Sequence, residues 1–182
     1  GKKQVIDSLD SLKSKGITKI ISSPFPRTME TAEIILESLG LDKEKLSFDD
    51  RLGEHYIGVL NGHSVDDYHK IANTNEAVFD IRVEGGENLA DVKARTGEFL
   101  YKTDNSNKDE TILIVTHEHT TWALESAGKG LNRKETILFG GDEKEFIKNA
   151  EVREMDFIQI PHNEKFELDL HRPYIDNAVL VD

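Results

Sequence analysis

The sequence predicts an α/β fold, a three-layer sandwich in which a mostly parallel sheet carries helices on both faces. Two short runs rich in β-branched residues, 17–23 and 111–115, each continue through a loop into a segment with helical spacing. Strands that alternate with helices in this way form parallel sheets covered on both sides. The chain has 182 residues, of which 37% are hydrophobic, and these are enough to bury one core.

The first forty residues are expected to form a helix, a strand and a second helix. The opening helix carries its apolar residues on one face: Val5, Ile6, Leu9 and Leu12. Gly16 is placed to end this helix, and the β-branched run at residues 17–23 predicts a buried strand. Two prolines then force an irregular connection. Residues 28–39 return to helical spacing, and Gly40 follows as a C-cap.

The middle of the chain is expected to alternate between loops and helices. Residues 48–63 are punctuated by Gly and His and show no clear period, which is typical of a structured loop. Long loops of this kind often line functional sites. A short helix is expected at residues 65–72 and a longer one at 88–101, followed by a polar surface link at 103–110.

The second half repeats the order of strand, polar loop and helix. Residues 111–115 (TILIV) predict the most apolar strand of the sheet, expected to be buried, and the helix beyond it contains Trp122, expected in the core. Residues 151–160 alternate between apolar and polar side chains and predict a further strand. Residues 163–182 are acidic and aromatic and do not continue this order, so we expect them to form a separate piece.

Composition excludes several classes of function. The chain has 23 basic and 35 acidic side chains, a net charge of −12, which opposes direct binding to nucleic acid or to an anionic membrane surface. Without cysteine there is no disulfide, no thiolate metal site and no thiol nucleophile. No apolar run reaches membrane length and no signal-peptide pattern opens the chain, so a soluble, cytoplasmic protein is expected.

Two side chains are expected to meet at one edge of the sheet. Arg27 follows the first strand and His117 follows the strand at 111–115. Ligands of parallel sheets bind beyond the carboxyl ends of the strands, so these two side chains should lie together there. A guanidinium at a helix start suits a phosphate, and an imidazole can act as acid, base, nucleophile or metal ligand. Glu54, in the loop at 48–63, is a candidate proton donor or base.

Each of these residues also has a simpler interpretation. Arg27 and Glu54 can be solvated surface residues, and His117 can be a hydrogen-bonded structural histidine. His117 and His119 form a His-x-His pair, a spacing that is used to bind divalent metals. A metal hydrolase built on this pair is therefore a further hypothesis for the function. No His-Glu-x-x-His motif and no phosphate-binding P-loop occurs, and no metal or cofactor is expected.

Four segments, in order, resemble the histidine phosphatase superfamily, the phosphoglycerate-mutase-like fold. They are SSPFPRTMETA from residue 22, RLGEHYIGVLNG from residue 51, GGENLADVKAR from residue 85 and ILIVTHEH from residue 112. The resemblance implies that Ser23, Arg27 and His117 bind the phosphoryl group and that His117 stabilises it during transfer. It also implies that Glu54 donates the proton to the leaving oxygen. The expected partner is then a phosphorylated small molecule or another phosphate ester.

The chain departs from the family's pattern in one important place. The family's nucleophile is a histidine in an Arg-His-Gly sequence on a first strand, and no Arg-His-Gly occurs here. Residues 1–4 (GKKQ) resemble the residues that follow that motif, so we expect the first strand to be missing and the chain to be inactive as it stands. Glu118 and Asn88 stand where the family often has Gly and Ser, and no signature at 64–84 or 131–149 identifies the substrate.

The end of the chain resembles a second family. PHNEKFELDLHRPYID, residues 161–176, is similar to a segment of class I isoleucyl-tRNA synthetases. The resemblance implies a histidine-phosphatase-like domain at 1–158 and a synthetase-like tail at 159–182, with His171 and Arg172 as scaffold. The expected function is then phosphoryl transfer, as a phosphatase or mutase, by a domain inserted in an isoleucine-tRNA ligase. The alternative is a non-catalytic anion-binding or structural inserted module.

Overall fold

The computed structural model describes residues 2–141 and 147–171 and contains a parallel sheet of three strands. The strands are β1 (Lys19–Ser22), β2 (Leu46–Phe48) and β3 (Ile112–Val115), in the spatial order β2-β1-β3. Ile21 of β1 lies opposite Ser47 on one side and Ile114 on the other. All three strands run in the same direction, so the loops that leave β1 and β3 emerge at the same edge of the sheet.

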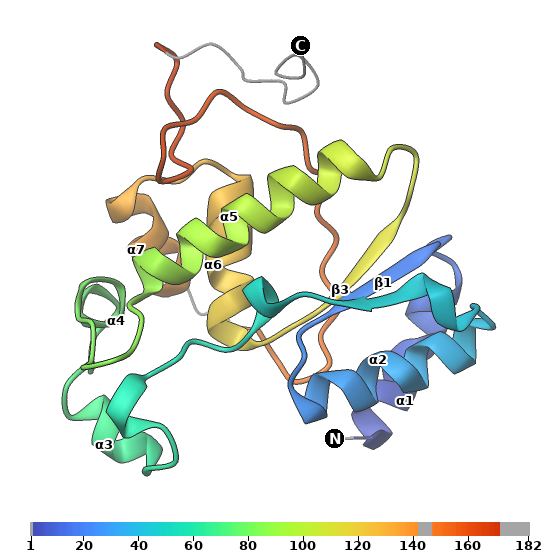
Figure 1. Ribbon diagram of the computed structural model, residues 1–182, viewed down its shortest axis with the longest axis horizontal. Helices are drawn as coiled ribbons and strands as arrows, with labels where there is room; N and C mark the ends of the chain where they lie inside the picture. The colour runs from blue at the N-terminus through green and yellow to red at the C-terminus, as the bar shows by residue number, and fades with distance from the viewer. Residues whose placement is uncertain (1, 142–146, 172–182) are drawn as a thin grey trace.

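Helices cover both faces of this sheet, which confirms the predicted three layers (Figure 1). Helices α1 (Lys2–Lys13) and α2 (Pro26–Leu39) cover one face, and α5 (Leu89–Ser106) and α6 (Glu118–Gly128) cover the other. Side chains alternate along a strand. Leu113 of β3 therefore joins the apolar cluster under α1 and α2, whereas Ile114 joins the cluster under α5 and α6.

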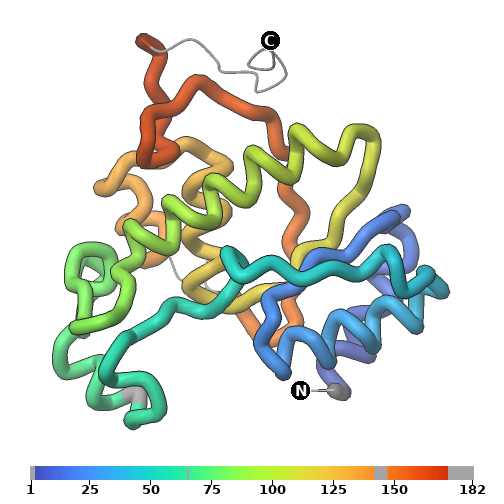
Figure 2. The backbone as a smooth tube through the Cα atoms, in the orientation of Figure 1, coloured from blue at the N-terminus to red at the C-terminus, as the bar shows by residue number. Residues whose placement is uncertain are grey.

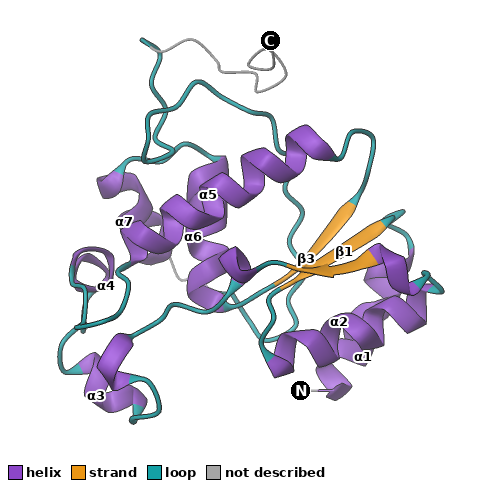
Figure 3. Ribbon diagram, viewed as in Figure 1, coloured by secondary structure: helices purple, strands orange, loops and turns teal. Residues whose placement is uncertain are grey.

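The helices α5 and α6 extend beyond the sheet and support three shorter helices (Figure 3). These are α3 (Val65–His69), α4 (Asn75–Asp80) and α7 (Arg133–Gly141). Their apolar side chains form one cluster with α5 and α6: Tyr68, Phe79, Val92, Ala123 and Ile137 are among its members. The helix at 65–72 was predicted, but α4 and α7 were not, because neither is long enough for its apolar spacing to stand out.

Two helix ends agree with the sequence, whereas α3 and α5 end at other residues than expected. Gly40 ends α2 in the left-handed conformation, with φ 65°, as its position predicts. Asn88 begins α5 through a capping box with Asp91. The polar link predicted at 103–110 is wrong in its first part, because α5 continues to Ser106. Ile6, expected on the buried face of α1, is 57% exposed.

Two strand predictions differ from the structure. The predicted strand at 151–160 is wrong, because this segment is extended but forms no ladder with the described strands. Its alternation instead places Val152 against the cluster under α1 and α2, and Met155 and Phe157 against the cluster under α5 and α6. The strand β3 was expected to be buried, yet all four of its residues are half-buried because β3 is an edge strand of the described sheet.

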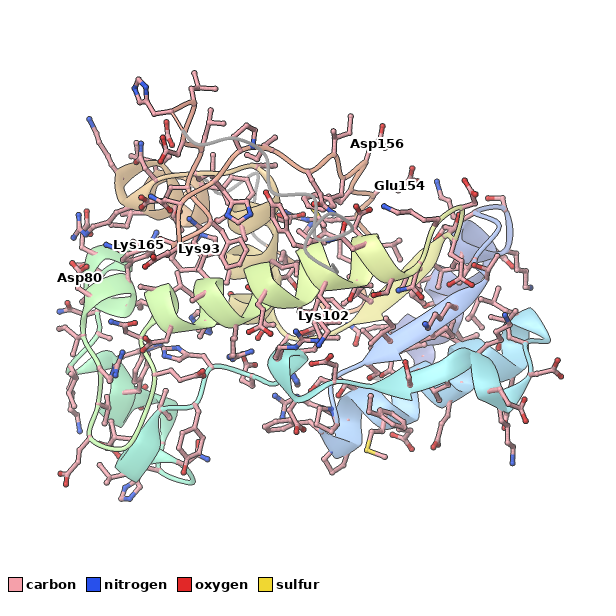
Figure 4. The ribbon with its side chains drawn as sticks, turned by 45° about the horizontal axis from the view of Figure 1, so that its top comes forward. Asp80, Lys93, Lys102, Glu154, Asp156 and Lys165 are labelled. Carbon is pink, nitrogen blue, oxygen red and sulfur yellow. The ribbon has the colours of Figure 1, made fainter. Side chains whose placement is uncertain are left out.

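Residues 159–171 pack on α5 (Figure 2). The N–H of Leu168 donates to the carbonyl of Gly130, and the ring of Phe166 fills the space that a Cβ on Gly97 would occupy. Lys93 of α5 is buried, and its Nζ donates to the carbonyl of Lys165 at 3.2 Å (Figure 4). Burial lowers the pKa of Lys93 to about 8. Residues 172–182 of the predicted tail, including Arg172, lie outside the described residues.

Candidate functional site

The loops after β1 and β3 bring Arg27 and His117 into contact, as the sheet topology predicts. Arg27 lies in the first turn of α2, and His117 is the N-cap residue of α6. The guanidinium Nη2 of Arg27 donates to Nδ1 of His117 at 2.8 Å. Two residues that are ninety positions apart in the sequence therefore form one polar cluster at the carboxyl edge of the sheet.

This contact determines the protonation of His117. A guanidinium can only donate hydrogen bonds, so Nδ1 of His117 accepts and Nε2 carries the proton. Nε2 then donates to Oγ of Ser23, also at 2.8 Å. The His117 side chain is 2% exposed. Burial, together with the positive charges of Arg27 and Arg95, lowers its pKa to about 4, so the ring is neutral at pH 7.

Glu54 completes the cluster. Its Oε2 lies 3.4 Å from Nη2 of Arg27 and 3.6 Å from Nδ1 of His117. Its Oε1 accepts a hydrogen bond from the backbone N–H of His55 and lies 4.0 Å from Nδ1 of His119. Burial raises the pKa of Glu54, although the His55 N–H and the charge of Arg27 act in the opposite direction. A carboxyl group with a raised pKa beside a cation is suited to donate and accept protons.

The loop that carries Glu54 is held to the sheet by contacts that the sequence does not reveal. Oγ1 of Thr116 donates to the carbonyl of Leu52, and Oγ1 of Thr120 donates to the carbonyl of Gly53, both at 2.7 Å. Nη2 of Arg95, on α5, donates to the carbonyl of Glu54 at 3.2 Å. These bonds place the Glu54 carboxylate over the ends of β1 and β3.

Arg95 forms a second ion pair beside the site, with Glu87. Its Nε donates to Oε1 of Glu87 at 2.8 Å, and its Nη2 donates to Oε2 at 3.1 Å. Both residues lie in the segment from residue 85 that resembles the family, but nothing in their spacing predicts this bidentate pair. His55 bonds to the same segment, because its Nε2 lies 2.8 Å from the carbonyl of Glu87.

An aromatic side chain lies beside the polar cluster. Phe25, the N-cap residue of α2, is 37% exposed and contacts the His117 ring edge to face, with the centroids 5.1 Å apart. The Arg27 guanidinium lies over the Phe25 ring, 5.2 Å from its centroid. The Arg27 side chain is 60% exposed. Arg27 is therefore the most exposed of the four predicted site residues, which are Ser23, Arg27, Glu54 and His117.

Neither a metal centre nor a membrane helix emerges from residues 2–141 and 147–171. Within these ranges, no three His, Cys, Asp or Glu side chains are grouped so that they can share a metal ion. His119, the candidate second ligand, lies beside Glu54, and its ring contacts His55 edge to face at 5.4 Å. None of the helices described here has the length and apolar character needed to cross a bilayer.

Several solved structures share this fold. The mycobacterial glucosyl-3-phosphoglycerate phosphatase Rv2419c superimposes with a TM-score of 0.65 at 23% identity, covering 76% of this chain and 71% of that one. The alpha-ribazole phosphatase from Shigella flexneri superimposes with a TM-score of 0.60 at 17% identity, covering 74% and 67%. At these identities the likeness is one of fold.

Sequence comparison identifies the family. Proteins described as probable phosphoglycerate mutase GpmB, from Salmonella paratyphi B and Salmonella newport, are 31% identical to this chain over 139 residues. The match covers 72% of this chain and 62% of theirs, so the chain spans less than two thirds of these relatives. The sequence profile of the histidine phosphatase superfamily, branch 1, matches residues 1–162. The chain therefore belongs to branch 1 of the histidine phosphatase superfamily.

Proposed function

We propose that this domain transfers the phosphoryl group of phosphate monoesters, as a phosphatase or mutase, through a phosphohistidine. The observation that carries the proposal is the cluster of Arg27, His117 and Glu54, in which two nitrogens and a carboxylate oxygen lie within 3.6 Å of one another. A cation and an imidazole beside a carboxyl group with a raised pKa provide the charge stabilisation and the proton donor that phosphoryl transfer needs. The related mutases and the two phosphatases of similar fold act as supporting analogies.

In the proposed reaction the phosphoryl group replaces the contact between Arg27 and His117. Arg27 donates to two phosphoryl oxygens, and His117, once protonated at Nδ1, donates to a third. A histidine nitrogen attacks phosphorus while the bond to the leaving oxygen breaks, and Glu54 gives its proton to that oxygen. Water then attacks the phosphohistidine, Glu54 takes a proton from the water, and the phosphorus–nitrogen bond breaks to release phosphate.

The attacking nitrogen is proposed to come from an Arg-His-Gly strand outside these 182 residues. The family resemblance supports this part of the proposal, since the chain contains no Arg-His-Gly sequence. The edge of β3 supports it as well. The residues of β3 (Ile112–Val115) are all apolar, as in a central strand of a parallel sheet, but all four are half-buried. A further strand paired with β3 would cover this edge and place its own carboxyl end beside His117.

We also propose that residues 159–182 derive from an isoleucyl-tRNA synthetase, so that the phosphatase-like domain proper comprises residues 1–158. The support is the string LHRPY at residues 170–174. The proposed boundary separates two segments of different ancestry, not two domains that fold independently. Lys93 and Gly97 of α5 contact Lys165 and Phe166 across it.

Hydrolysis of an aryl phosphate tests the proposed function. We would compare the 182-residue chain with a longer protein from the same gene that includes an Arg-His-Gly strand upstream. We expect turnover by the longer protein and none by the shorter chain, since only the former carries the nucleophile. Arg27→Gln and His117→Gln, each introduced into the longer protein, should abolish the turnover, whereas Glu44→Gln, at the opposite edge of the sheet, should not.

A different outcome would favour the second candidate function, an anion-binding module without catalysis. The absence of Arg-His-Gly from the 182 residues is the observation that favours this candidate. If the longer protein binds phosphate with the same Arg27 dependence but releases none from the ester, the catalytic roles of Glu54 and His117 are wrong. If turnover persists after both substitutions, the site lies elsewhere.

A further inference from the structure

We infer, on the basis of the proposed function, that Glu87 is a positioning residue that orients the carboxyl group of Glu54, the proposed proton donor. Glu87 lies two residues before α5, and its side chain is 26% exposed. Both its backbone and its carboxylate bond to the loop that carries Glu54. It acts on Glu54 through Arg95 and through the two residues that follow Glu54.

The first step is the close approach of the Glu87 backbone to the loop of Glu54. The N–H of Glu87 donates to the carbonyl of Tyr56, and the carbonyl of Glu87 accepts from Nε2 of His55, both at 2.8 Å. Gly86 makes this approach possible, because a Cβ there would lie 2.7 Å from the carbonyl oxygen of Tyr56. The two residues that follow Glu54 are therefore held by the backbone of Glu87.

The second step concerns the carboxylate of Glu87, which joins the same loop to α5. Its Oε2 accepts a hydrogen bond from the backbone N–H of Tyr56 at 3.2 Å. Its two oxygens also accept from Nε and Nη2 of Arg95, whose side chain is 18% exposed. A bidentate pair of this kind fixes the orientation of the guanidinium. The Arg95 guanidinium is thereby directed at the backbone carbonyls of Arg51 and Glu54, to which it donates.

The third step concerns the peptide group between Glu54 and His55. Its carbonyl accepts from Nη2 of Arg95 at 3.2 Å, and its N–H donates to Oε1 of Glu54 at 3.0 Å. A peptide group is planar, so a bond that fixes the direction of the carbonyl also fixes the direction of the N–H. Arg95, itself held by Glu87, therefore sets the hydrogen bond that orients the Glu54 carboxylate.

This orientation matters because the two oxygens of Glu54 have different surroundings. Oε1 accepts the bond from His55, whereas Oε2 lies 3.4 Å from Nη2 of Arg27 and 3.6 Å from Nδ1 of His117. Oε2 is therefore the oxygen on the side of the proposed phosphoryl group. A proton donor has to lie within hydrogen-bond reach of the leaving oxygen. A peptide group that turns away would thus impair protonation of the leaving oxygen and leave the guanidinium of Arg27 in place.

An NMR titration of Glu54 in the 182-residue chain tests this positioning directly. Glu87→Asp keeps the negative charge, but its side chain is one methylene too short to reach both Arg95 and the N–H of Tyr56. We expect the amide proton of His55 to respond less when Glu54 titrates, because the bond between them is weakened. The pKa of Glu54, which burial raises, should rise further, because the bond from the His55 N–H acts to lower it.

Two further variants make this result specific. Arg95→Lys keeps the charge but loses the paired N–H groups, so it should reproduce both changes by releasing the same peptide group. Glu98→Asp is the matched control, because Glu98 also lies on α5 but pairs with Arg51 and is 66% exposed. It should change neither readout. Unchanged readouts in both Glu87→Asp and Arg95→Lys would overturn the inference, as would equal changes in Glu98→Asp.

Two phosphate esters distinguish positioning from general support of the site, in the longer protein that includes an Arg-His-Gly strand. p-Nitrophenyl phosphate releases a stabilised anion, whereas glycerol 3-phosphate releases an alkoxide that needs the proton of Glu54. We expect Glu87→Asp to lower kcat/KM about tenfold for glycerol 3-phosphate, the loss from a misaligned proton donor, and to leave kcat/KM for p-nitrophenyl phosphate nearly unchanged.

The outcomes separate this role from the proposed function. Equal losses with the two esters would mean that Glu87 supports the whole site, and would overturn its role in positioning Glu54. If the unsubstituted longer protein hydrolyses neither ester, the proposed function fails. The NMR titration of the 182-residue chain would still decide whether Glu87 orients Glu54.

Discussion

Arg27→Gln is expected to weaken the binding of inorganic phosphate to this chain by about 100-fold, because it removes the open cation from the site. The guanidinium is 60% exposed and is held in place by His117 at 2.8 Å and by Glu54 at 3.4 Å. Gln keeps a hydrogen-bond donor, but it lacks the positive charge of Arg and the two parallel N–H groups that bind two phosphate oxygens. Arg27→Lys keeps only the positive charge. Its phosphate affinity should therefore lie between those of the unchanged chain and Arg27→Gln, about tenfold below the unchanged chain.

Calorimetric titration with phosphate measures these losses, and the pKa of His117 provides a second readout. The charge of Arg27 helps to lower that pKa, so Arg27→Gln should raise it. Arg133→Gln is the matched control, because Arg133 forms an exposed ion pair with Asp80 away from the site. Phosphate affinity that survives in Arg27→Gln but not in Arg133→Gln would place the anion site outside the cluster described above.

Gly58→Ala should lower the free energy of unfolding by about 3 kcal/mol, the largest loss of stability that we expect from adding one methyl group. It should also disturb the loop that carries Glu54. Gly58 has a φ of 58°, and a Cβ there would lie 2.1 Å from the backbone oxygen of Glu84 and 2.6 Å from the backbone nitrogen of Gly86. Neither backbone atom can move away cheaply, because Val59 N–H donates to the same Glu84 oxygen.

Gly62→Ala measures the cost of a positive φ for alanine without the steric clash that is expected at Gly58. Gly62 has a φ of 87°, but a Cβ there would meet no atom within 4 Å, so we expect a loss of only about 1 kcal/mol. Urea unfolding of both variants gives the comparison. Equal losses would mean that the loops around Gly58 and Gly86 are not packed as described. Loss of phosphate binding by folded Gly58→Ala, with binding retained in Gly62→Ala, would show that this packing also supports the anion site.

The meeting of Arg27 and His117 could be predicted because it depends on topology. Each residue follows an apolar strand, and parallel strands present their carboxyl ends at one edge. The same reasoning could not predict β2, because Leu46–Phe48 has three residues and shows no readable alternation. It also predicted a strand at 151–160 that does not form, since alternation requires only an extended backbone whose side chains pack on two sides.

The remaining parts of the site could not be predicted because they join distant segments through single hydrogen bonds. Thr116 and Thr120 hold the loop of Glu54 by bonds to backbone carbonyls, which any loop residue could supply. The pair between Glu87 and Arg95 depends on how α5 approaches that loop. The half-buried state of β3 depends on its place at the sheet edge, which its apolar sequence does not indicate.

The titration of His117, followed by NMR with and without saturating sulfate, tests most directly whether an oxyanion binds between Arg27 and His117. Sulfate resembles a phosphoryl group and keeps its charge throughout the titration. Without it, we expect a pKa of about 4, because burial, Arg27 and Arg95 disfavour the charged ring. Bound sulfate should neutralise Arg27 and accept a bond from protonated Nδ1, so the pKa should rise and sulfate should bind more tightly as the pH falls. A His117 pKa that does not change while sulfate is bound would contradict this account.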